Sequence, residues 1–376
     1  MGYEIGTPSN TLKSFNVSID GVALTQAQVI QLKIKWDVSN LKIQGVLVFN
    51  DLSNLVESLP IRGGNKVLTA MTDFSGNVSK EELILTDISY TRTDEGGTLV
   101  QVDLTDTLTV ESMKMFNGMS WSSADMTEII DHNETLKPSI KKSKDFTSSL
   151  EPHLNFVMPL HVSFNVVTHW LARNNNVMWF QTRDSLVIQP LDELFSRSST
   201  GDPFMYKVSN GSYRRNIYDI STKFNNLLRT NMFQANGKVA YFNPTDKGAS
   251  YEENNATKAI EDIGSLGDAD ISIDSTGFKH FYKSAYHIED KVNSMWQRSA
   301  YKSLTLEILV PGDFSNNIGD VIKLDIVNRD SSTSQEVNIN GEWMITEIVD
   351  IIATPDFIQR MTLNRAKFSE SGSGFF

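Results

Sequence analysis

Glu82-Leu-Ile-Leu-Thr-Asp-Ile88 returns near the other end of the chain as Glu342-Trp-Met-Ile-Thr-Glu-Ile348, and this repeated stretch decides the fold. Both copies read acid, three apolar residues, threonine, acid, isoleucine, at a shift of 260 positions from Glu82 to Glu342. A second pair, Asp51-Leu-Ser-Asn54 and Asp313-Phe-Ser-Asn316, repeats at a shift of 262. Two landmarks at nearly one shift and in the same order favour a duplicated β module, although alternating strands also resemble each other by coincidence.

The elements around the landmarks follow the same order in both halves. Between the landmarks each copy has a strand that begins with glycine, Gly64 to Leu68 and Gly319 to Lys323, and another strand closes each copy near Leu104 and Leu363. If the duplication holds, the chain has two copies of one β domain with other material inserted between them.

Both ends of the chain are rich in predicted strands. β-branched and apolar residues alternate with polar ones, and Gly, Pro, Asn and Asp separate the runs. The residues Asp94-Glu-Gly-Gly97 are typical of a tight turn, so the two runs that flank them predict a hairpin. The predicted strands are residues 44–49, 83–90, 98–104, 304–310, 321–326, 343–351 and 357–364.

The middle of the chain mixes helical and extended patterns. Helical spacing of apolar residues, or capping residues before them, predicts helices at 122–131, 164–171 and 285–301. Apolar runs predict a hairpin of 177–180 with 185–188 and a strand at 217–224. Polar composition predicts loops at 132–155, 195–212 and 248–267, the last of them mobile. The tail 369–376 has a flexible-linker composition, and its terminal Phe375 and Phe376 either fray or anchor a partner.

Composition excludes several classes of protein. The chain has 376 residues, 34 Lys+Arg against 46 Asp+Glu, a net charge of −12 and no cysteine. The acidic balance argues against a general nucleic-acid binder, and the lack of cysteine excludes disulfides and thiolate chemistry. No basic-then-apolar leader and no run of about 20 apolar residues is present, so we expect a soluble product made in a reducing cytoplasm.

No motif names an active site. The six histidines form no His-Glu-x-x-His pair, and no P-loop, nucleophile elbow or dinucleotide fingerprint occurs. Asp268-Ala-Asp-Ile-Ser-Ile-Asp274 has alternating oxygens but lacks the glycine and the final glutamate of a calcium loop. We therefore predict no catalytic, cofactor-binding or metal-binding residue, and no enzymatic activity.

The C-terminal run contains Pro311-Gly-Asp-Phe314, Ile318 to Leu324, Gly341 to Ile348 and Arg360-Met-Thr-Leu-Asn-Arg365. This run resembles the end of baseplate hub proteins of contractile-tailed phages. The resemblance is closest to the central hub of T-even phages and extends more distantly to type VI secretion spike proteins. Phe164-Asn-Val-Val-Thr-His-Trp-Leu171, followed by Met178-Trp-Phe180, is similar to a helix-then-hairpin unit of that family, and Gly45 to Asp51 is similar to its early strand.

The resemblance implies a β-dominated α+β fold with two similar β-barrel-like tube domains and inserted α/β domains. Three copies would form a trimeric pseudo-six-fold ring. The implied domains are a first tube domain at 1–115, an inserted α/β domain at 116–203, a second tube domain at 204–236 plus 301–368, an inserted helical and loop domain at 237–300, and the tail at 369–376.

The resemblance also implies a function and partners. The expected role is a structural hub in the virion tail baseplate, assembled in the host bacterial cytoplasm, that joins a hexameric tail tube to a trimeric central spike. The implied partners are two further copies of the chain, a tail-tube or tube-initiator protein, the spike and baseplate wedge proteins, with no membrane contact. DNA would pass through the lumen without specific binding, and the charge of −12 either repels it or only maintains solubility.

Two other functions compete with the hub. A tail-associated peptidoglycan hydrolase would need a catalytic constellation, and none is found. A carbohydrate-binding receptor protein would need an exposed aromatic platform, whereas most tryptophans lie in patterns that predict burial.

Overall fold

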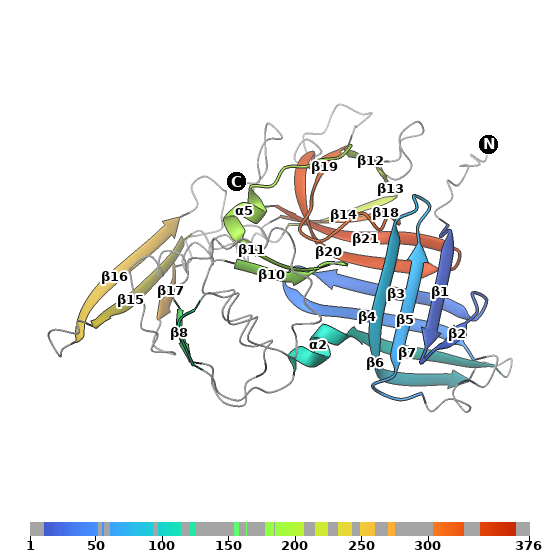
Figure 1. Ribbon diagram of the computed structural model, residues 1–376. Coiled ribbons are helices and arrows are strands. Elements are labelled where there is room, and N and C mark those ends of the chain that lie inside the picture. Colours follow the sequence, from blue (N-terminus) through green and yellow to red (C-terminus); the bar gives the residue numbers. More distant parts are fainter. Residues whose placement is uncertain are drawn as a thin grey trace.

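The computed structural model describes residues 11–51, 55, 61–92, 97–113, 120–124, 154–157, 163, 177–183, 185–206, 215–224, 232–242, 249–259, 270–274, 304–326 and 339–365. β-strands dominate this part of the chain, as the sequence predicts, and its helices are short. Figure 1 shows blue strands from the first half beside red strands from the end, so the two halves share one sheet.

The first half forms an antiparallel strand unit, β3 to β7, which we call the first unit. Its strands are β3 (Val29–Asp37), β4 (Asn40–Asn50), β5 (Lys66–Thr72), β6 (Val78–Arg92) and β7 (Thr98–Asp106). In space they follow the order β3-β4-β7-β6-β5, and β1 (Ser14–Ile19) and β2 (Val22–Leu24) extend the sheet beyond β5. Period-2 alternation buries one face: Leu32, Ile34 and Trp36 of β3 are at most 2% exposed.

The last third of the chain forms the second unit with the same pairing order. It contains β14 (Asp219–Phe224), β18 (Leu304–Pro311), β19 (Val321–Asp325), β20 (Gly341–Ala353) and β21 (Asp356–Arg365), paired as β14-β18-β21-β20-β19. Each strand therefore has a counterpart: β3 with β14, β4 with β18, β5 with β19, β6 with β20 and β7 with β21. The edges differ, because β12 (Phe204–Tyr206) and β13 (Asn216–Ile217) add parallel strands beyond β19.

The repeated sequence corresponds to one backbone device built twice. Gly64 and Gly319 both have positive φ, +96° and +83°. The Gly64 N–H donates to Leu85 O and the Gly319 N–H donates to Ile345 O, each at an N···O distance of 2.8 Å. In return, the N–H of Leu85 donates to Asn65 O at 2.9 Å and that of Ile345 to Asp320 O at 2.8 Å.

A β-bulge follows at the same place in both units. The register shifts between Leu85 and Asp87 in β6, and between Ile345 and Glu347 in β20. The bulged threonines use their hydroxyls alike: Thr86 Oγ1 donates to Asp103 O at 3.0 Å and Thr346 Oγ1 to Thr362 O at 3.1 Å. Bulges re-aim a strand, so a bulge shared at the 260-residue shift supports duplication over coincidence.

The strands predicted at both ends of the chain are confirmed, and the hairpin of 177–180 with 185–188 is confirmed as β10 (Val177–Gln181) with β11 (Leu186–Pro190). The sequence analysis placed no strand before residue 44, although β1, β2 and β3 lie there, and it did not predict α2 (Thr107–Ser112) or α5 (Leu191–Phe195).

Four predictions in the middle of the chain were wrong where the structure describes it. Ser122 and Ser123, expected as helix caps, lie in β8 (Ser120–Ala124), which pairs with β9 (Leu154–Val157) at the end of the predicted 132–155 loop. The predicted loop 195–212 contains β12. The predicted mobile loop 248–267 contains β16 (Ala249–Ala259), paired with β15 (Met232–Phe242), which also pairs with β17 (Asp270–Asp274). β12 has only three residues, and β16 is mostly polar in sequence, so neither shows the apolar alternation by which a strand is predicted.

Other predictions fall outside the described residues. The helices at 164–171 and 285–301, the rest of 125–131 and the tail 369–376 belong to this group. Among the residues that the structure does describe, no helix has the length and apolar character needed to cross a bilayer.

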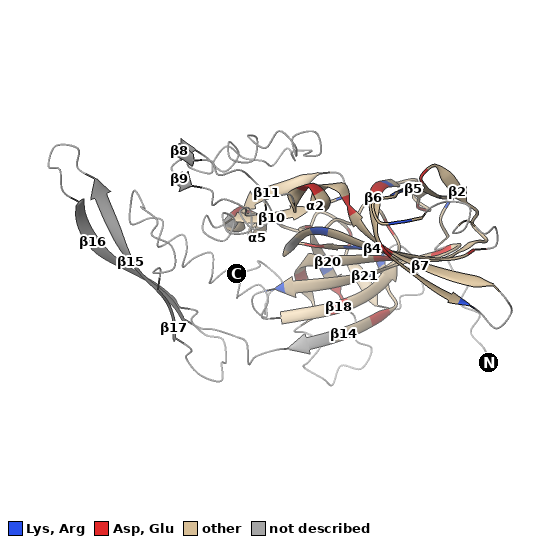
Figure 2. Ribbon diagram, turned by 90° about the horizontal axis from the view of Figure 1, so that it is seen from below, with Lys and Arg blue, Asp and Glu red and all other residues tan. Residues whose placement is uncertain are grey.

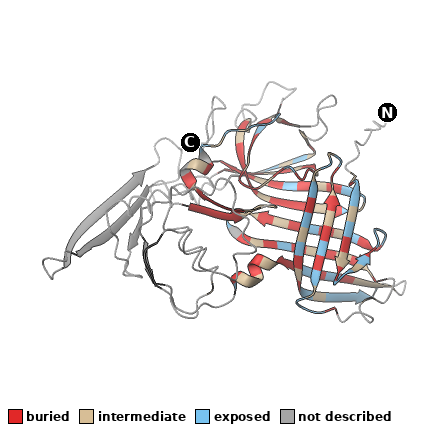
Figure 3. Ribbon diagram, viewed as in Figure 1, coloured by how far each residue is buried: buried red, intermediate tan, exposed pale blue. Residues whose placement is uncertain are grey.

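The buried core continues through both units. Figure 3 shows buried residues along the central strands of the large sheet, and one hydrophobic cluster runs from Val17 and Leu32 to Met361 and Leu363. Trp36, Trp179 and Trp343 are buried at 2%, 6% and 1% exposure, which removes them from any aromatic binding platform.

Candidate functional site: the junction of the two units

The two units meet where β3 pairs with β20. Residues Leu32–Asp37 run antiparallel to Glu347–Ile352, with Lys33 opposite Ile351 and Lys35 opposite Val349. Lys35 Nζ lies 2.6 Å from Glu347 Oε2 on the more exposed face of this pair. The junction is therefore a continuous sheet with a defined register rather than a contact between two closed bodies.

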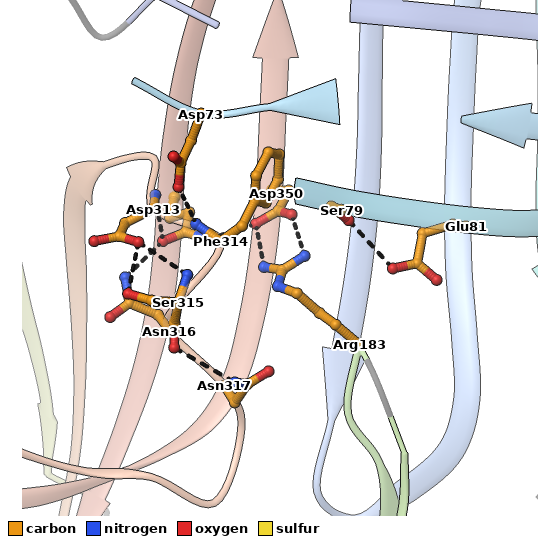
Figure 4. Close-up of polar contacts among 11 residues, drawn as sticks. Asp73, Ser79, Glu81, Arg183, Asp313, Phe314, Ser315, Asn316, Asn317 and Asp350 are labelled. Atoms are coloured by element: carbon orange, nitrogen blue, oxygen red, sulfur yellow. Dashed lines mark hydrogen bonds and ion pairs between the residues drawn. The ribbon is translucent and has the colours of Figure 1, made fainter. Parts of the chain in front are cut away.

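A buried ion pair closes the junction from the opposite face. Arg183 Nη1 and Nη2 donate to Asp350 Oδ2 and Oδ1 at 2.6 and 2.9 Å, and the two side chains are 5% and 0% exposed. The guanidinium also lies over the Trp36 ring, 4.1 Å from its centroid. Arg183 comes from the β10–β11 turn, and Figure 4 shows its ion pair with Asp350 of β20. One side chain from the middle of the chain therefore contacts a strand of each unit.

A chain of hydrogen bonds extends from Asp350 across the second unit. Gln359 Nε2 donates to Asp350 Oδ1 at 2.8 Å, and Gln359 Oε1 accepts from the Asp313 N–H at 3.2 Å and from Asn316 Nδ2 at 2.9 Å. Asp313, one of the landmark residues, also accepts from the backbone and hydroxyl of Ser315 (Figure 4).

The same network reaches the first unit through the β5–β6 turn. Asp73 Oδ2 accepts from the Phe314 N–H at 2.9 Å, and Asn77 Nδ2 donates to Asp73 and to Asp313 at 3.0 and 3.1 Å. Asp73 and Asp350 are 1% and 0% exposed, so these bonds lie away from solvent. Buried polar groups that hydrogen-bond to one another favour one arrangement of the two surfaces, which suits a rigid joint.

The hairpin that supplies Arg183 also packs on the repeated turn of the second unit. A Cβ added at Gly319 would lie 2.7 Å from Phe180 Cζ, whereas a Cβ at Gly64 would meet nothing within 4 Å. The two glycines thus share one backbone conformation, but only Gly319 is covered by the inserted hairpin.

Two buried carboxyls near these turns have perturbed pKa values. Burial raises the pKa of Asp320 above its ordinary value, against the hydrogen bond from the Asn317 N–H and the charges of Arg197 and Arg215. Burial likewise raises the pKa of Asp106, whose carboxylate caps α2 by accepting from the Thr109 N–H at 2.9 Å. Both shifts follow from desolvation in structural positions.

The sequence named no site residue, so the junction was missed as a site. Asp313 had been noted only as part of a landmark, and no motif marks Arg183 in Gln181-Thr-Arg-Asp-Ser185. No group of three or more potential metal ligands occurs within the described residues. The chemistry of the junction is that of a packed, hydrogen-bonded connection between strand units.

Comparison with solved structures finds proteins with a similar architecture. The 43 kDa tail protein of prophage MuSo2 from Shewanella oneidensis matches with a TM-score of 0.66 at 15% identity, covering 93% of this chain and 97% of that chain. The chain has the fold of phage tail proteins. A tail protein from Neisseria meningitidis MC58 matches equally well, with a TM-score of 0.66 at 11% identity over 96% of this chain and 99% of that one.

A secretion component shares this tail-protein fold. The E. coli c3393 protein, a type VI secretion system component described as structurally similar to T4 tail proteins gp27 and gp5, matches with a TM-score of 0.53 at 9% identity. The match covers 96% of this chain and 78% of that one. The resemblance read from the sequence to baseplate hub and secretion spike proteins is thus confirmed at the level of fold. No protein-family model and no curated protein matches the sequence.

Proposed function

We propose that this protein is a structural hub of a phage tail baseplate, which joins a hexameric tail tube to a trimeric central spike. The tail-protein fold supports a structural tail role. The repeated unit supports the finer role, because one chain then offers two nearly equivalent strand surfaces. The observation that carries the proposal is the duplicated turn and bulge at Gly64–Leu85 and Gly319–Ile345.

The duplication would let one ring have both three-fold and approximate six-fold symmetry. Three copies of a chain with two similar units present six units around one axis, while the chains themselves keep three-fold symmetry. Such a ring matches a six-fold tube on one face and a three-fold spike on the other. The rigid, buried junction at Arg183 and Asp350 would hold the two units of each chain at one fixed rotation.

The domain assignment follows the same logic. We assign the tube domains to 1–115 and to 204–236 plus 301–368, with insertions at 116–203 and 237–300, as the sequence resemblance implies. The strand units β3–β7 and β14 with β18–β21 fall inside the two tube assignments. In its described residues, the second insertion has strands rather than helices: β16 and β17 lie inside it, and β15 crosses its assigned start at residue 237.

The half-exposed face of the shared sheet is the candidate lumen lining. It carries charges of both signs, among them Lys33, Lys35 and Arg360 with Asp103 and Glu307, and Figure 2 shows both signs along these strands. Mixed charge would neither grip nor strongly repel a phosphate backbone, so DNA passage would depend on the lack of a basic track more than on acidic repulsion.

Native mass spectrometry of the purified full chain tests the hub role. We expect a mass of three chains, and, with a candidate trimeric spike from the same tail, a complex of three plus three. A single-chain mass in both samples would contradict the proposal. A zymogram on bacterial cell walls tests the competing hydrolase role, and clear lysis would favour that role over a purely structural hub.

A further inference from the structure

We propose that β14 of one copy pairs with the second half of β6 of the next copy, in the register that joins β3 to β20 inside each chain. The inference rests on the proposed hub function and names its self-assembly surface: the partner is a second copy of this chain. The β3–β20 pairing inside each chain, which we call the internal junction, is the template for the proposed β14–β6 pairing between copies, the external junction.

The template depends on how β20 uses its two halves. On one edge, Gly341–Met344 of β20 pairs with β19, and Glu347–Ile352 pairs with β3 beyond the bulge. In the first unit, Val78–Ile84 of β6 pairs with the counterpart strand β5. Beyond the bulge, the corresponding edge of Asp87–Arg92 has no partner among the described strands.

In the second unit, the edge of β14 that corresponds to the β20-facing edge of β3 also has no partner among the described strands. β3 lies between β4 and β20, whereas its counterpart β14 pairs only with β18 among the described strands. One open edge therefore belongs to the first unit and the other to the second unit. An eight-strand path, β6-β7-β4-β3-β20-β21-β18-β14, separates them.

Side-chain exposure also differs between the paired half of β20 and the open half of β6. Ile348 and Ile352, in the half of β20 that pairs with β3, are 1% and 0% exposed, whereas Tyr90 in the open half of β6 is 50% exposed. Unpaired, extended edges with exposed apolar side chains are surfaces that proteins normally cover. A strand from another copy would cover this edge through backbone hydrogen bonds.

The register follows from matched rows of opposed residues. One row crosses the first unit and its match crosses the second, so that each residue in one has a counterpart in the other. The rows are Asp87, Asp103, Val46 and Lys33 in the first unit, and Glu347, Thr362, Glu307 and Ser221 in the second. Ser221 thus corresponds to Lys33.

Transferring the internal pairing gives the external one. Lys33 faces Ile351 inside the chain. The counterpart of Ile351 at the 260-residue shift is Thr91, so Thr91 of one copy faces Ser221 of the next. Both residues are exposed in the single chain.

The charge pattern repeats as well. The internal junction has the Lys35–Glu347 pair at 2.6 Å. By register the counterpart of Lys35 is Lys223, and the counterpart of Glu347 is Asp87. The external junction therefore brings Lys223 of one copy to Asp87 of the next, again with opposite charges.

This pairing is head-to-tail, because each copy uses a different edge toward each neighbour. A heterologous contact is satisfied at every copy only if the rotation closes into a ring or continues as a filament. The internal junction joins the counterpart strands in the same order, so the proposed pairing requires the external rotation to equal the internal one.

Disulfide trapping in the otherwise cysteine-free chain tests the register. Directly opposed strand residues have Cα atoms about 4.5–5.5 Å apart, within the range of a disulfide. We expect the double variant Thr91→Cys with Ser221→Cys to form covalent dimers and trimers on a non-reducing gel after mild oxidation. The matched control, Thr91→Cys with Ile220→Cys, moves one thiol to the opposite face of β14 and should stay at single-chain size.

Charge reversal provides the second arm. Asp87→Lys or Lys223→Glu should weaken assembly roughly 2- to 10-fold in dissociation constant, and the double reversal should restore it. Glu82→Lys is the control, since Glu82 lies in the half of β6 that pairs with β5 and contacts Lys66.

The outcomes separate this inference from the hub function. A three-chain mass with no Thr91–Ser221 cross-link, or with equal cross-linking in the Ile220 control, would overturn the pairing and leave the hub standing. Efficient specific cross-linking in filaments or in rings of another size would support the pairing and contradict the trimeric hub. A monomer without cross-links would overturn both.

Discussion

Arg183 ties the inserted hairpin to both strand units. Its ion pair with Asp350 is almost fully removed from water, and truncating one member of such a pair leaves an uncompensated buried charge. We expect Arg183→Met to lower the free energy of unfolding by about 3–5 kcal/mol, measured by urea denaturation.

The double variant separates charge burial from lost packing. Arg183→Met with Asp350→Asn removes both charges. The asparagine keeps an oxygen that can accept the hydrogen bond that Gln359 Nε2 donates to Asp350 in the wild type. The double variant should regain at least half of the lost stability. Equal losses in the single and double variants would mean that packing of the arginine over Trp36, not the buried charge, dominates.

Gly64 and Gly319 form a natural matched pair for a second prediction. Both have positive φ, so alanine at either costs about 1–2 kcal/mol in backbone strain. Gly319→Ala should cost a further 1–3 kcal/mol, because its Cβ would clash with Phe180. Denaturation midpoints of the two variants check this, and equal losses would refute the packing of the hairpin on the turn.

Asp320 yields a pH prediction that the chain itself suggests. Burial raises the pKa of Asp320, so its ionised form destabilises the fold, and wild-type stability at this site falls as pH rises from the unfolded pKa through the raised folded pKa. Asn65 occupies the equivalent turn position, and its Oδ1 accepts from the Arg62 N–H as Asp320 Oδ2 accepts from Asn317.

We therefore expect Asp320→Asn to raise the melting temperature at pH 7 and to lose that advantage as the pH falls toward 4. Melting curves at several pH values measure the difference. An advantage that grows at low pH would have the wrong sign for a carboxyl with a raised pKa, and would contradict the assignment.

At the scale of strands, β6 and β20 are counterparts in the two units, but they have different strand neighbours. β20 has strand partners on both edges along Glu347–Ile352, whereas the counterpart Asp87–Arg92 has a described partner only in β7. At a protein concentration low enough to keep the chain unassembled, we expect amides of 87–92 to exchange with deuterium faster than those of 347–352.

Assembly should remove most of that difference. Hydrogen-exchange mass spectrometry on the wild-type assembly would then show slow exchange in both segments. Fast exchange of 87–92 that persists in the assembled protein would mean that another surface mediates assembly.

The elements show how far sequence reasoning reaches. Alternation predicted β18 to β21 almost residue for residue, because one face of each strand is buried. β3 has equally clear alternation in Val29–Asp37 and was overlooked, although its burial pattern was readable. β16 was not readable, since Ala249–Ala259 contains mostly polar residues and its pairing with β15 depends on backbone hydrogen bonds.

The site was less accessible than the fold. The repeated stretch pointed to the duplication, and its residues have the same backbone roles in both units: Leu85 and Ile345 bond to the glycine turns, and a bulge follows each of them. The bulges themselves were not predicted. Arg183 and Asp350 lie 167 positions apart and belong to no motif, so only the packing of the β10–β11 turn against β20 brings them together. Neighbouring residues in space from distant parts of a chain leave no local signal.

For the whole molecule, duplication and the fixed junction together define a rotation between two like units. If the same junction recurs between chains, the rotation repeats around an axis until the ring closes. Six units close with three chains only when each step is one sixth of a turn.

Electron microscopy of the purified assembly tests this closure most directly. Class averages viewed along the axis should show a ring of three chains with six similar lobes around a central opening. A ring with any other number of lobes, or an open filament, would contradict the account of a two-unit chain that presents six-fold geometry with three copies.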